Sequence, residues 1–176
     1  MFRMSRRLTS FPTEKKYLLR FVNKTGRNVD ILWINYEGEP VRYHTILPED
    51  HLDMNTYISH TWTFEDTETR DKRAVNNLPY YPADWEKYFF YDPETIANLN
   101  IHEQISLDRI ILMIKIPMYS LSDCCLQVFR DSFNWKQNIA LLDQLKYELP
   151  KTLYDELFMM VIRKELPFSK RLYKYI

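Results

Sequence analysis

Short segments of apolar or alternating residues, separated by turn residues, fill the first half of this chain. Residues 16–23, 29–36 and 41–47 are rich in β-branched and aromatic side chains, and Gly26 and Gly38 stand between them. Close spacing of such segments predicts an antiparallel β-sandwich. The segment 29–36 is apolar at successive positions, which predicts a central strand covered on both faces.

The segment 55–64 has no glycine or proline and is almost wholly aromatic, β-branched or hydroxyl-bearing, which predicts one further strand. Alternation would then place one set of side chains on a single face. This set comprises Thr56, Ile58, His60, Trp62 and Phe64. An apolar floor with a hydroxyl and an imidazole at its rim is typical of a small-ligand site. A core strand whose polar end reaches solvent has the same pattern.

The later part of the chain changes from strand to helix patterns. Residues 77–106 show no clean period and predict a long loop or insertion, before a last strand at 107–116. Ser120 and Asp123 form a capping-box pattern at the start of a first helix. A second helix is predicted over 135–149.

A third helix is predicted over 153–165, with Thr152 and Asp155 as its capping pair. Strands followed by helices predict an α+β chain with a sandwich domain and a small all-helical domain. We expect a flexible tail over 1–15, a β domain over 16–118, a helical domain over 119–150 and a C-terminal helix with its tail over 151–176.

The first helix carries an apolar stripe at helical spacing. The stripe comprises Leu121, Cys124, Cys125, Val128 and Phe129. A helical domain this small buries little surface by itself, so part of the stripe is a candidate partner surface. Ordinary burial against neighbouring elements explains the same spacing.

Composition excludes several function classes. The 24 basic and 24 acidic residues balance, which argues against a nucleic-acid binder. With only two glycines the chain has no P-loop, dinucleotide fingerprint or nucleophile elbow. The four histidines and two cysteines lack metal-ligand spacing, so we expect no metal and no cofactor.

Composition also gives expectations for the compartment. The only two cysteines are adjacent and cannot link distant parts of the fold by a disulfide. No apolar run is long enough for a membrane span. The basic N-terminus lacks the apolar region of a secretory signal. We therefore expect a location in the cytoplasm, the nucleus or both.

Two runs of residues together resemble a known family. Residues 33–43 read Trp-Ile-Asn-Tyr-Glu-Gly-Glu-Pro-Val-Arg-Tyr, and Tyr57, His60, Trp62 and Phe64 follow at fixed spacing. This run resembles the β domain of the von Hippel–Lindau tumour-suppressor family. The segment 117–130 resembles that family's elongin C-binding box, which has Ser/Thr-Leu, then a small residue four positions after the Leu, then an apolar residue four positions later.

The resemblance implies a non-catalytic substrate receptor of a cullin-RING ubiquitin ligase that acts in the hypoxia response. Its β domain would bind 4-hydroxyproline in the α subunit of hypoxia-inducible factor, and its partners would be elongin C, elongin B, a cullin and a RING-finger protein. The implied peptide-binding residues are Trp33, Tyr43, Asn55, Thr56, Tyr57, His60 and Trp62. The proline ring would lie between the side chains of Trp33, Tyr57 and Trp62. Its carbonyl would form a hydrogen bond with Tyr43. Its hydroxyl would form hydrogen bonds with Thr56 and His60. The implied elongin C contacts are the five residues of the apolar stripe, and Arg130 would brace the helices internally.

The sequence also departs from the family pattern. Thr56 stands where the family has Ser, Asn55 stands where it has His, and the segment 77–106 is longer. The last helix resembles a family segment that packs on the β domain. A scaffold or microtubule-associated adaptor that does not recognise hydroxyproline remains the alternative function. An enzyme that pairs His60 with Cys124 or Cys125 is disfavoured, because no third group orients the imidazole.

Overall fold

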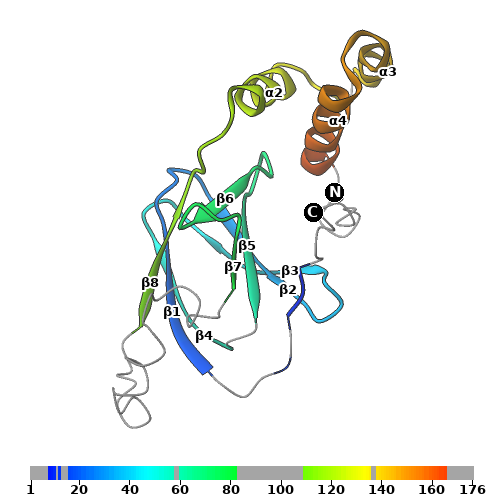
Figure 1. Cartoon of the computed structure of the whole chain (residues 1–176). Coiled ribbons are helices and arrows are strands. Elements are labelled where there is room, and N and C mark those ends of the chain that lie inside the picture. The colour runs from blue at the N-terminus through cyan, green and yellow to red at the C-terminus, as the bar shows by residue number, and fades with distance from the viewer. Residues whose placement is uncertain are drawn as a thin grey trace, which may run out of the picture. The chain divides into compact units, whose positions relative to one another are not determined.

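The computed structural model describes residues 8–10, 12, 16–57, 60–82, 109–135 and 138–165. The chain divides into two compact units (Figure 1). The β unit holds the strands, and the helical unit holds the helices from Met118 onward together with the segment Asp66–Asp71. The segment 83–108, which contains most of the predicted insertion, lies outside the described residues.

Eight strands form the β unit. They are β1 (Lys16–Asn23), β2 (Val29–Ile34), β3 (Pro40–Ile46), β4 (His51–Tyr57), β5 (Thr61–Asp66), β6 (Lys72–Val75), β7 (Tyr80–Pro82) and β8 (Ile110–Lys115). The predicted strands at 16–23, 29–36, 41–47 and 107–116 are therefore confirmed, with bounds that agree to within three residues. β2 lies between β3 and β5, so its prediction as a central strand is also confirmed.

The strands join in the order β3-β2-β5-β6-β8-β1-β4, with β7 beside β5. The expectation of a purely antiparallel sandwich is wrong in detail, because β1 and β8 pair in parallel, with Leu19 opposite Ile110. β6 pairs with β5 through Lys72 and Arg73 and with β8 through Ala74 and Val75. β6 therefore joins β3-β2-β5 on one side to β8-β1-β4 on the other, and the result is one mixed, barrel-like sheet.

The predicted single strand over 55–64 is wrong. β4 ends at Tyr57, and β5 begins at Thr61. The two strands have different partners, since β4 pairs with β1 and β5 pairs with β6 and β7. Alternation along one strand therefore does not place Thr56, His60 and Trp62 on a common face.

The core of the β unit lies between the two halves of the sheet. Phe21 on β1 is fully buried, and its ring lies 5.1 Å from that of Phe64 on β5. It also contacts the rings of Trp62 and Tyr81 at 6.4 and 6.2 Å. Because β1 and β5 are separated by two strands in the sheet order, these contacts across the core show that the sheet folds over onto itself.

The helical unit contains α2 (Leu121–Asp131), α3 (Ile139–Glu148) and α4 (Lys151–Glu165). The predicted capping box of α2 is confirmed: the Asp123 amide donates to Ser120 Oγ at 3.1 Å, and the Ser120 amide donates to Asp123 Oδ2 at 3.0 Å. The predicted cap of the last helix is wrong, because α4 begins directly after Pro150 and already includes Thr152. A proline just before the first turn costs no intrahelical hydrogen bond.

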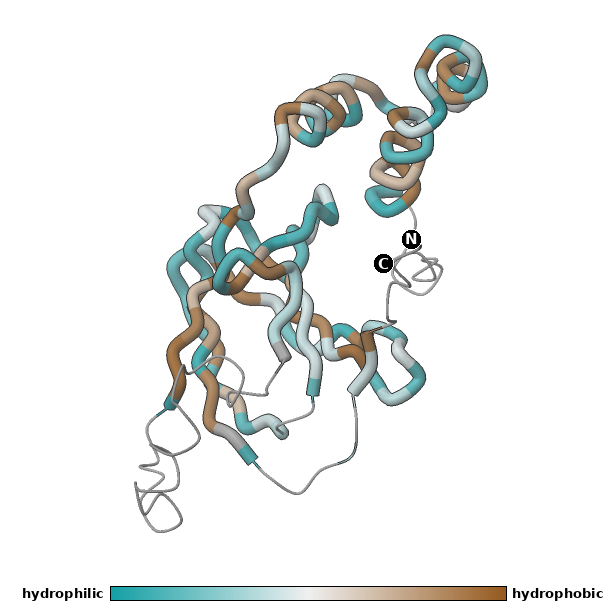
Figure 2. Tube along the Cα trace, in the orientation of Figure 1, coloured by the Kyte–Doolittle hydropathy of each residue, from teal (hydrophilic) through white to brown (hydrophobic). Residues whose placement is uncertain are grey.

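All three helices contribute to one apolar core. Its buried members are Leu126, Trp135, Leu142, Leu145, Leu157 and Val161. Leu157 and Val161 belong to α4, and Lys164 of α4 bonds the Asp131 carboxylate at 2.6 Å. The expectation that the last helix does not pack on the elongin-binding helices is therefore wrong for its described part. Figure 2 shows apolar residues recurring along all three helices. No helix in the described ranges is long and apolar enough to span a membrane.

Candidate functional site

The indole of Trp33 is held in place by the N-terminal segment. Its Nε1–H donates to Ser10 Oγ at 2.9 Å, and the amide of Thr61 donates to the same oxygen at 3.0 Å. The Ser10 hydroxyl in turn donates to the carbonyl of Ile34. Ser10 is 2% exposed, so this hydroxyl is an internal part of the site. The expectation of a flexible tail over 1–15 is therefore wrong at Thr9 and Ser10.

Three aromatic side chains surround the imidazole of His60. Its ring lies 5.2 Å from that of Trp33, 5.0 Å from that of Tyr57 and 6.0 Å from that of Tyr36. The backbone amide of His60 donates to the carbonyl of Tyr57 at 3.0 Å, which holds the backbone of His60 close to the end of β4. The residues of this cluster come from β2, the β2–β3 turn, the end of β4 and the β4–β5 connection.

A second group joins Thr56, Trp62 and Tyr43. The Trp62 indole N–H donates to Thr56 Oγ1 at 3.1 Å, and both side chains are almost fully buried. The Tyr43 ring stands edge-on to Trp62 at 5.3 Å and 81°, and 55% of this residue is exposed. A buried hydroxyl and an exposed tyrosine ring therefore both contact Trp62, and Thr56 precedes Tyr57 of the first cluster in the chain.

The two groups contain six of the seven peptide-binding residues that the resemblance implied. Asn55 is the exception. It is exposed and lies on the face of β4 opposite to the buried Met54 and Thr56, because neighbouring residues on a strand point to opposite sides. Asn55 takes no part in the contacts described above.

Sequence reasoning missed Ser10 and Tyr36. Tyr36 lies in the turn between β2 and β3, where its ring packs edge-on against Trp33 at 5.4 Å. A hydroxyl in a presumed tail and a tyrosine in a turn carry no local signal of their role.

The chemistry of the clusters suits binding better than catalysis. Burial lowers the pKa of His60 below its ordinary value, so the imidazole is neutral at pH 7 and offers one donor and one acceptor. Thr56 accepts from Trp62 and keeps its own O–H and a second lone pair. Apolar rings with two polar groups among them can read a small ligand that carries a hydroxyl.

The apolar stripe on α2 remains exposed in the described structure. Leu121 is 81% exposed and Val128 is 69% exposed, and both cysteines are also exposed. Phe129 is partly buried, because it packs on the helical core beside Trp135 and Phe133. Four of the five predicted stripe residues therefore face outward, and ordinary burial does not account for the stripe.

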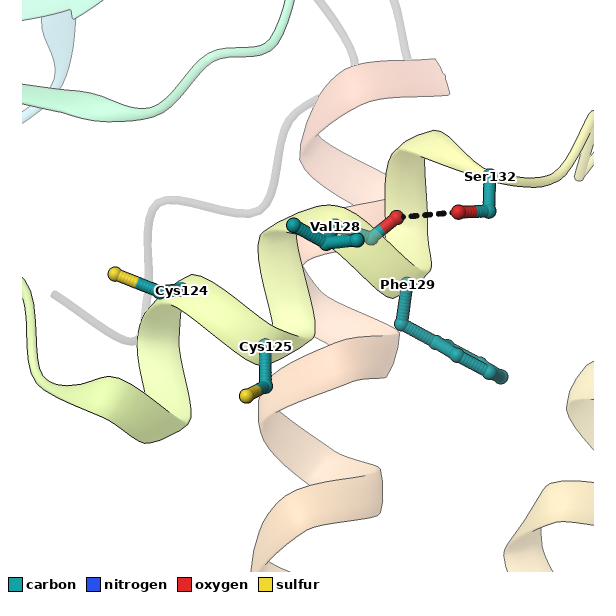
Figure 3. A pocket seen from close by; sticks show the side chains of 5 residues that line it. All are labelled: Cys124, Cys125, Val128, Phe129 and Ser132. Atoms are coloured by element: carbon teal, nitrogen blue, oxygen red, sulfur yellow. Dashed lines mark hydrogen bonds between the residues drawn. The ribbon is translucent and has the colours of Figure 1, made fainter.

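A shallow hollow of about 360 Å³ lies on this face of α2 (Figure 3). It is lined by Cys124, Cys125, Val128, Phe129 and Ser132. The Ser132 hydroxyl donates to the Val128 carbonyl at 2.8 Å and so satisfies one carbonyl at the end of the helix. The remaining lining is mostly carbon and sulfur, which suits an apolar side chain of a partner.

Arg130 is on the same helix but is not available to a partner. Its side chain is 1% exposed and bonds the carboxylates of Asp71 and Asp131. Burial opposes the charge, yet these carboxylates hold the pKa of Arg130 above its ordinary value. The expectation that Arg130 braces the helical unit internally is confirmed. In the described residues, no three His, Cys, Asp or Glu side chains come together as a metal site.

Two comparisons with known proteins show what this chain is similar to. Residues 8–87 match the family model described as the VHL beta domain. The chain is also 24% identical over 146 residues to the protein named "Protein Vhl" from Drosophila melanogaster, a match that spans 80% of this chain and 75% of that protein. The matched family range begins at residue 8 and therefore includes Ser10 and Tyr36.

Proposed function

We propose that this chain, which belongs to the von Hippel–Lindau family, is the substrate-recognition subunit of an elongin–cullin–RING ubiquitin ligase. Its β unit would bind 4-hydroxyproline in the α subunit of hypoxia-inducible factor and so mark that protein for degradation when oxygen is present. The subunit would work in the cytoplasm and the nucleus. It would perform no chemistry itself, because it raises the concentration of a bound substrate near a ubiquitin-charged enzyme.

One observation carries the proposal for the β unit. The imidazole of His60 lies beside the rings of Trp33 and Tyr57, and Thr56 Oγ1, one residue before Tyr57, accepts from the Trp62 indole. Flat rings suit the apolar faces of a proline, and the two polar groups suit a single hydroxyl on it. The exposed phenol of Tyr43 beside Trp62 is suited to a backbone carbonyl of the bound peptide.

The same arrangement explains why the hydroxyl would act as a switch. An unmodified proline ring has no donor or acceptor, so docking it would leave the polar groups of Thr56 and His60 unsatisfied. Each such group costs about 1–3 kcal/mol when it loses water without gaining a partner. Two groups therefore correspond to a loss of affinity of about 30-fold to more than 10⁴-fold. One oxygen added by an oxygen-dependent hydroxylase restores both bonds.

The test is a binding measurement with two matched peptides from hypoxia-inducible factor α, one with 4-hydroxyproline and one with proline. We expect the hydroxylated peptide to bind at least 30-fold more tightly in isothermal titration calorimetry. His60→Ala should remove most of this difference, whereas Tyr147→Phe, a change at an exposed residue of α3, should leave it unchanged. Equal affinities of the wild-type chain for the two peptides would contradict the proposal and would favour an adaptor that does not recognise hydroxyproline.

The helical unit supports the ligase part of the proposal. The apolar stripe on α2 is exposed, and the hollow beside it is lined by Cys125 and Val128. An amphipathic helix with exposed anchors at this spacing is a common way to enter a groove of a partner protein. We assign Leu121 as the anchor for elongin C, with Cys124, Cys125, Val128 and Phe129 as the surrounding contacts.

Leu121→Asp tests this assignment. A charge placed in an apolar interface would have to lose its water without a partner, so we expect capture of elongins C and B to fall at least 100-fold. The fold should survive, because Leu121 is 81% exposed. Tyr147→Asp provides the matched control, since Tyr147 is 85% exposed but lies outside the stripe. Undiminished capture of the elongins by a folded Leu121→Asp protein would exclude this surface as their binding site.

A further inference from the structure

The phenol of Tyr36 lies next to one particular nitrogen of His60. Tyr36 Oη and His60 Nε2 are 3.4 Å apart, and the two rings meet edge to face at 69°. This is a long hydrogen bond, and such bonds often shorten when a ligand binds. Because the contact involves Nε2, the other nitrogen, Nδ1, is the one left for a ligand.

Several contacts hold the Tyr36 side chain in this position. Its carbonyl accepts from Thr9 Oγ1 at 2.9 Å, and its ring packs at 89° against Trp33 at 5.4 Å. Trp33 is itself bonded to Ser10. The turn that carries Tyr36 is closed by the Gly38 amide, which donates to the Asn35 carbonyl at 3.0 Å. The hydroxyl of Tyr36 is thus placed by the fold, although 48% of the residue is exposed.

A neutral imidazole has one N–H and one bare nitrogen, and the bond made by one nitrogen decides the role of the other. A phenol is a good donor, and the half-exposed ring leaves its O–H free to turn toward Nε2. We propose that Tyr36 is a positioning residue that holds His60 with its proton on Nδ1, so that His60 acts as a hydrogen-bond donor to the ligand. This inference rests on the proposed function and assigns the polarity of the hydroxyl-reading pair.

The hydrogen-bonding role of Thr56, the second group that would contact the ligand hydroxyl, follows from the same structure. Thr56 Oγ1 already accepts from the Trp62 indole at 3.1 Å and retains one lone pair. A ligand oxygen that accepts from His60 Nδ1–H can therefore donate its own proton to Thr56 Oγ1. The ligand group must accept one bond and donate another. A hydroxyl does both, whereas a fluorine in its place accepts only weakly and donates nothing.

The tautomer is measured on the full unliganded chain by long-range proton–nitrogen NMR correlation of the histidine rings. We expect His60 to be predominantly the Nδ1–H form at neutral pH. Tyr36→Phe keeps the ring against Trp33 but removes the phenol, and it should shift His60 toward a mixture of both forms. Tyr147→Phe, which removes an exposed hydroxyl from α3, should change nothing. A dominant Nε2–H form in the wild-type chain would overturn the inference. An unchanged, predominantly Nδ1–H form in Tyr36→Phe would also overturn it.

Binding provides the second measurement, with peptides that carry 4-hydroxyproline, 4-fluoroproline or proline. Tyr36→Phe should weaken binding of the hydroxylated peptide about two- to tenfold and leave binding of the other two unchanged. An equal loss for all three peptides would show that Tyr36 acts only through packing and would refute the positioning role. Failure of the wild-type chain to prefer the hydroxylated peptide would instead refute the proposed function, while the tautomer spectrum of the free chain still decides the state of His60.

Discussion

Replacement of Phe21 by alanine is expected to lower the free energy of unfolding of the β unit by about 3–5 kcal/mol. Phe21 is fully buried and contacts the rings of Trp62, Phe64 and Tyr81. Its removal would leave a cavity where the two halves of the sheet meet. Domains are stable by about 5–15 kcal/mol, so this loss would remove a large part of the total.

The effect of the Phe21 change is best followed by hydrogen exchange measured by mass spectrometry, because peptides from the two units are then read separately. Phe21→Leu, a smaller change, should cost about 1 kcal/mol and keeps the comparison measurable if the alanine variant does not fold. Ile111→Ala is the control, since this residue on neighbouring β8 is 58% exposed. A loss below 1 kcal/mol for Phe21→Ala would contradict its place at the centre of the core.

Replacement of Arg130 by methionine is expected to destabilise the helical unit by about 3–5 kcal/mol. The guanidinium is 1% exposed and forms paired bonds with Asp71, of which Nη2 to Oδ2 measures 3.0 Å. Without it the Asp71 carboxylate, which is 12% exposed, would remain without its main partner. Urea denaturation followed by the fluorescence of buried Trp135, in a chain whose other tryptophans are replaced by phenylalanine, would measure the loss.

The double variant Arg130→Met with Asp71→Leu separates the charge from the packing. Removing both partners should recover much of the stability that the single variant loses, because no unpaired charge is then left. No recovery would mean that Arg130 acts by packing alone.

Loss of water raises the pKa of Asp131, but bonds from Arg130 and Lys164 hold it below its ordinary value of 3.8. The stabilising contribution of Asp131 is therefore present above about pH 4 and is lost as the pH falls through the lower folded pKa.

Local patterns in the sequence were sufficient for most of the elements. Strands β1, β2, β3 and β8 followed from β-branched and aromatic segments between turn residues, and α2 followed from the capping box of Ser120 and Asp123. The assignment of Trp33 and Tyr57 to one site with His60 came from the family resemblance, since no local rule joins Trp33 to His60. The pattern of residues 55–64 predicted one strand where the structure has the end of β4 and the start of β5, because periodicity does not show where a strand ends.

The sequence alone determined most of the strands and helices and which face of α2 is apolar. These properties depend on neighbours within a few residues. The tertiary structure decided the parallel pairing of β1 with β8, the position of α4 in the helical core, and the roles of Ser10 and Tyr36. Each of these depends on contacts between different elements of the fold, where the packing of the whole unit, and not local preference, selects the partner.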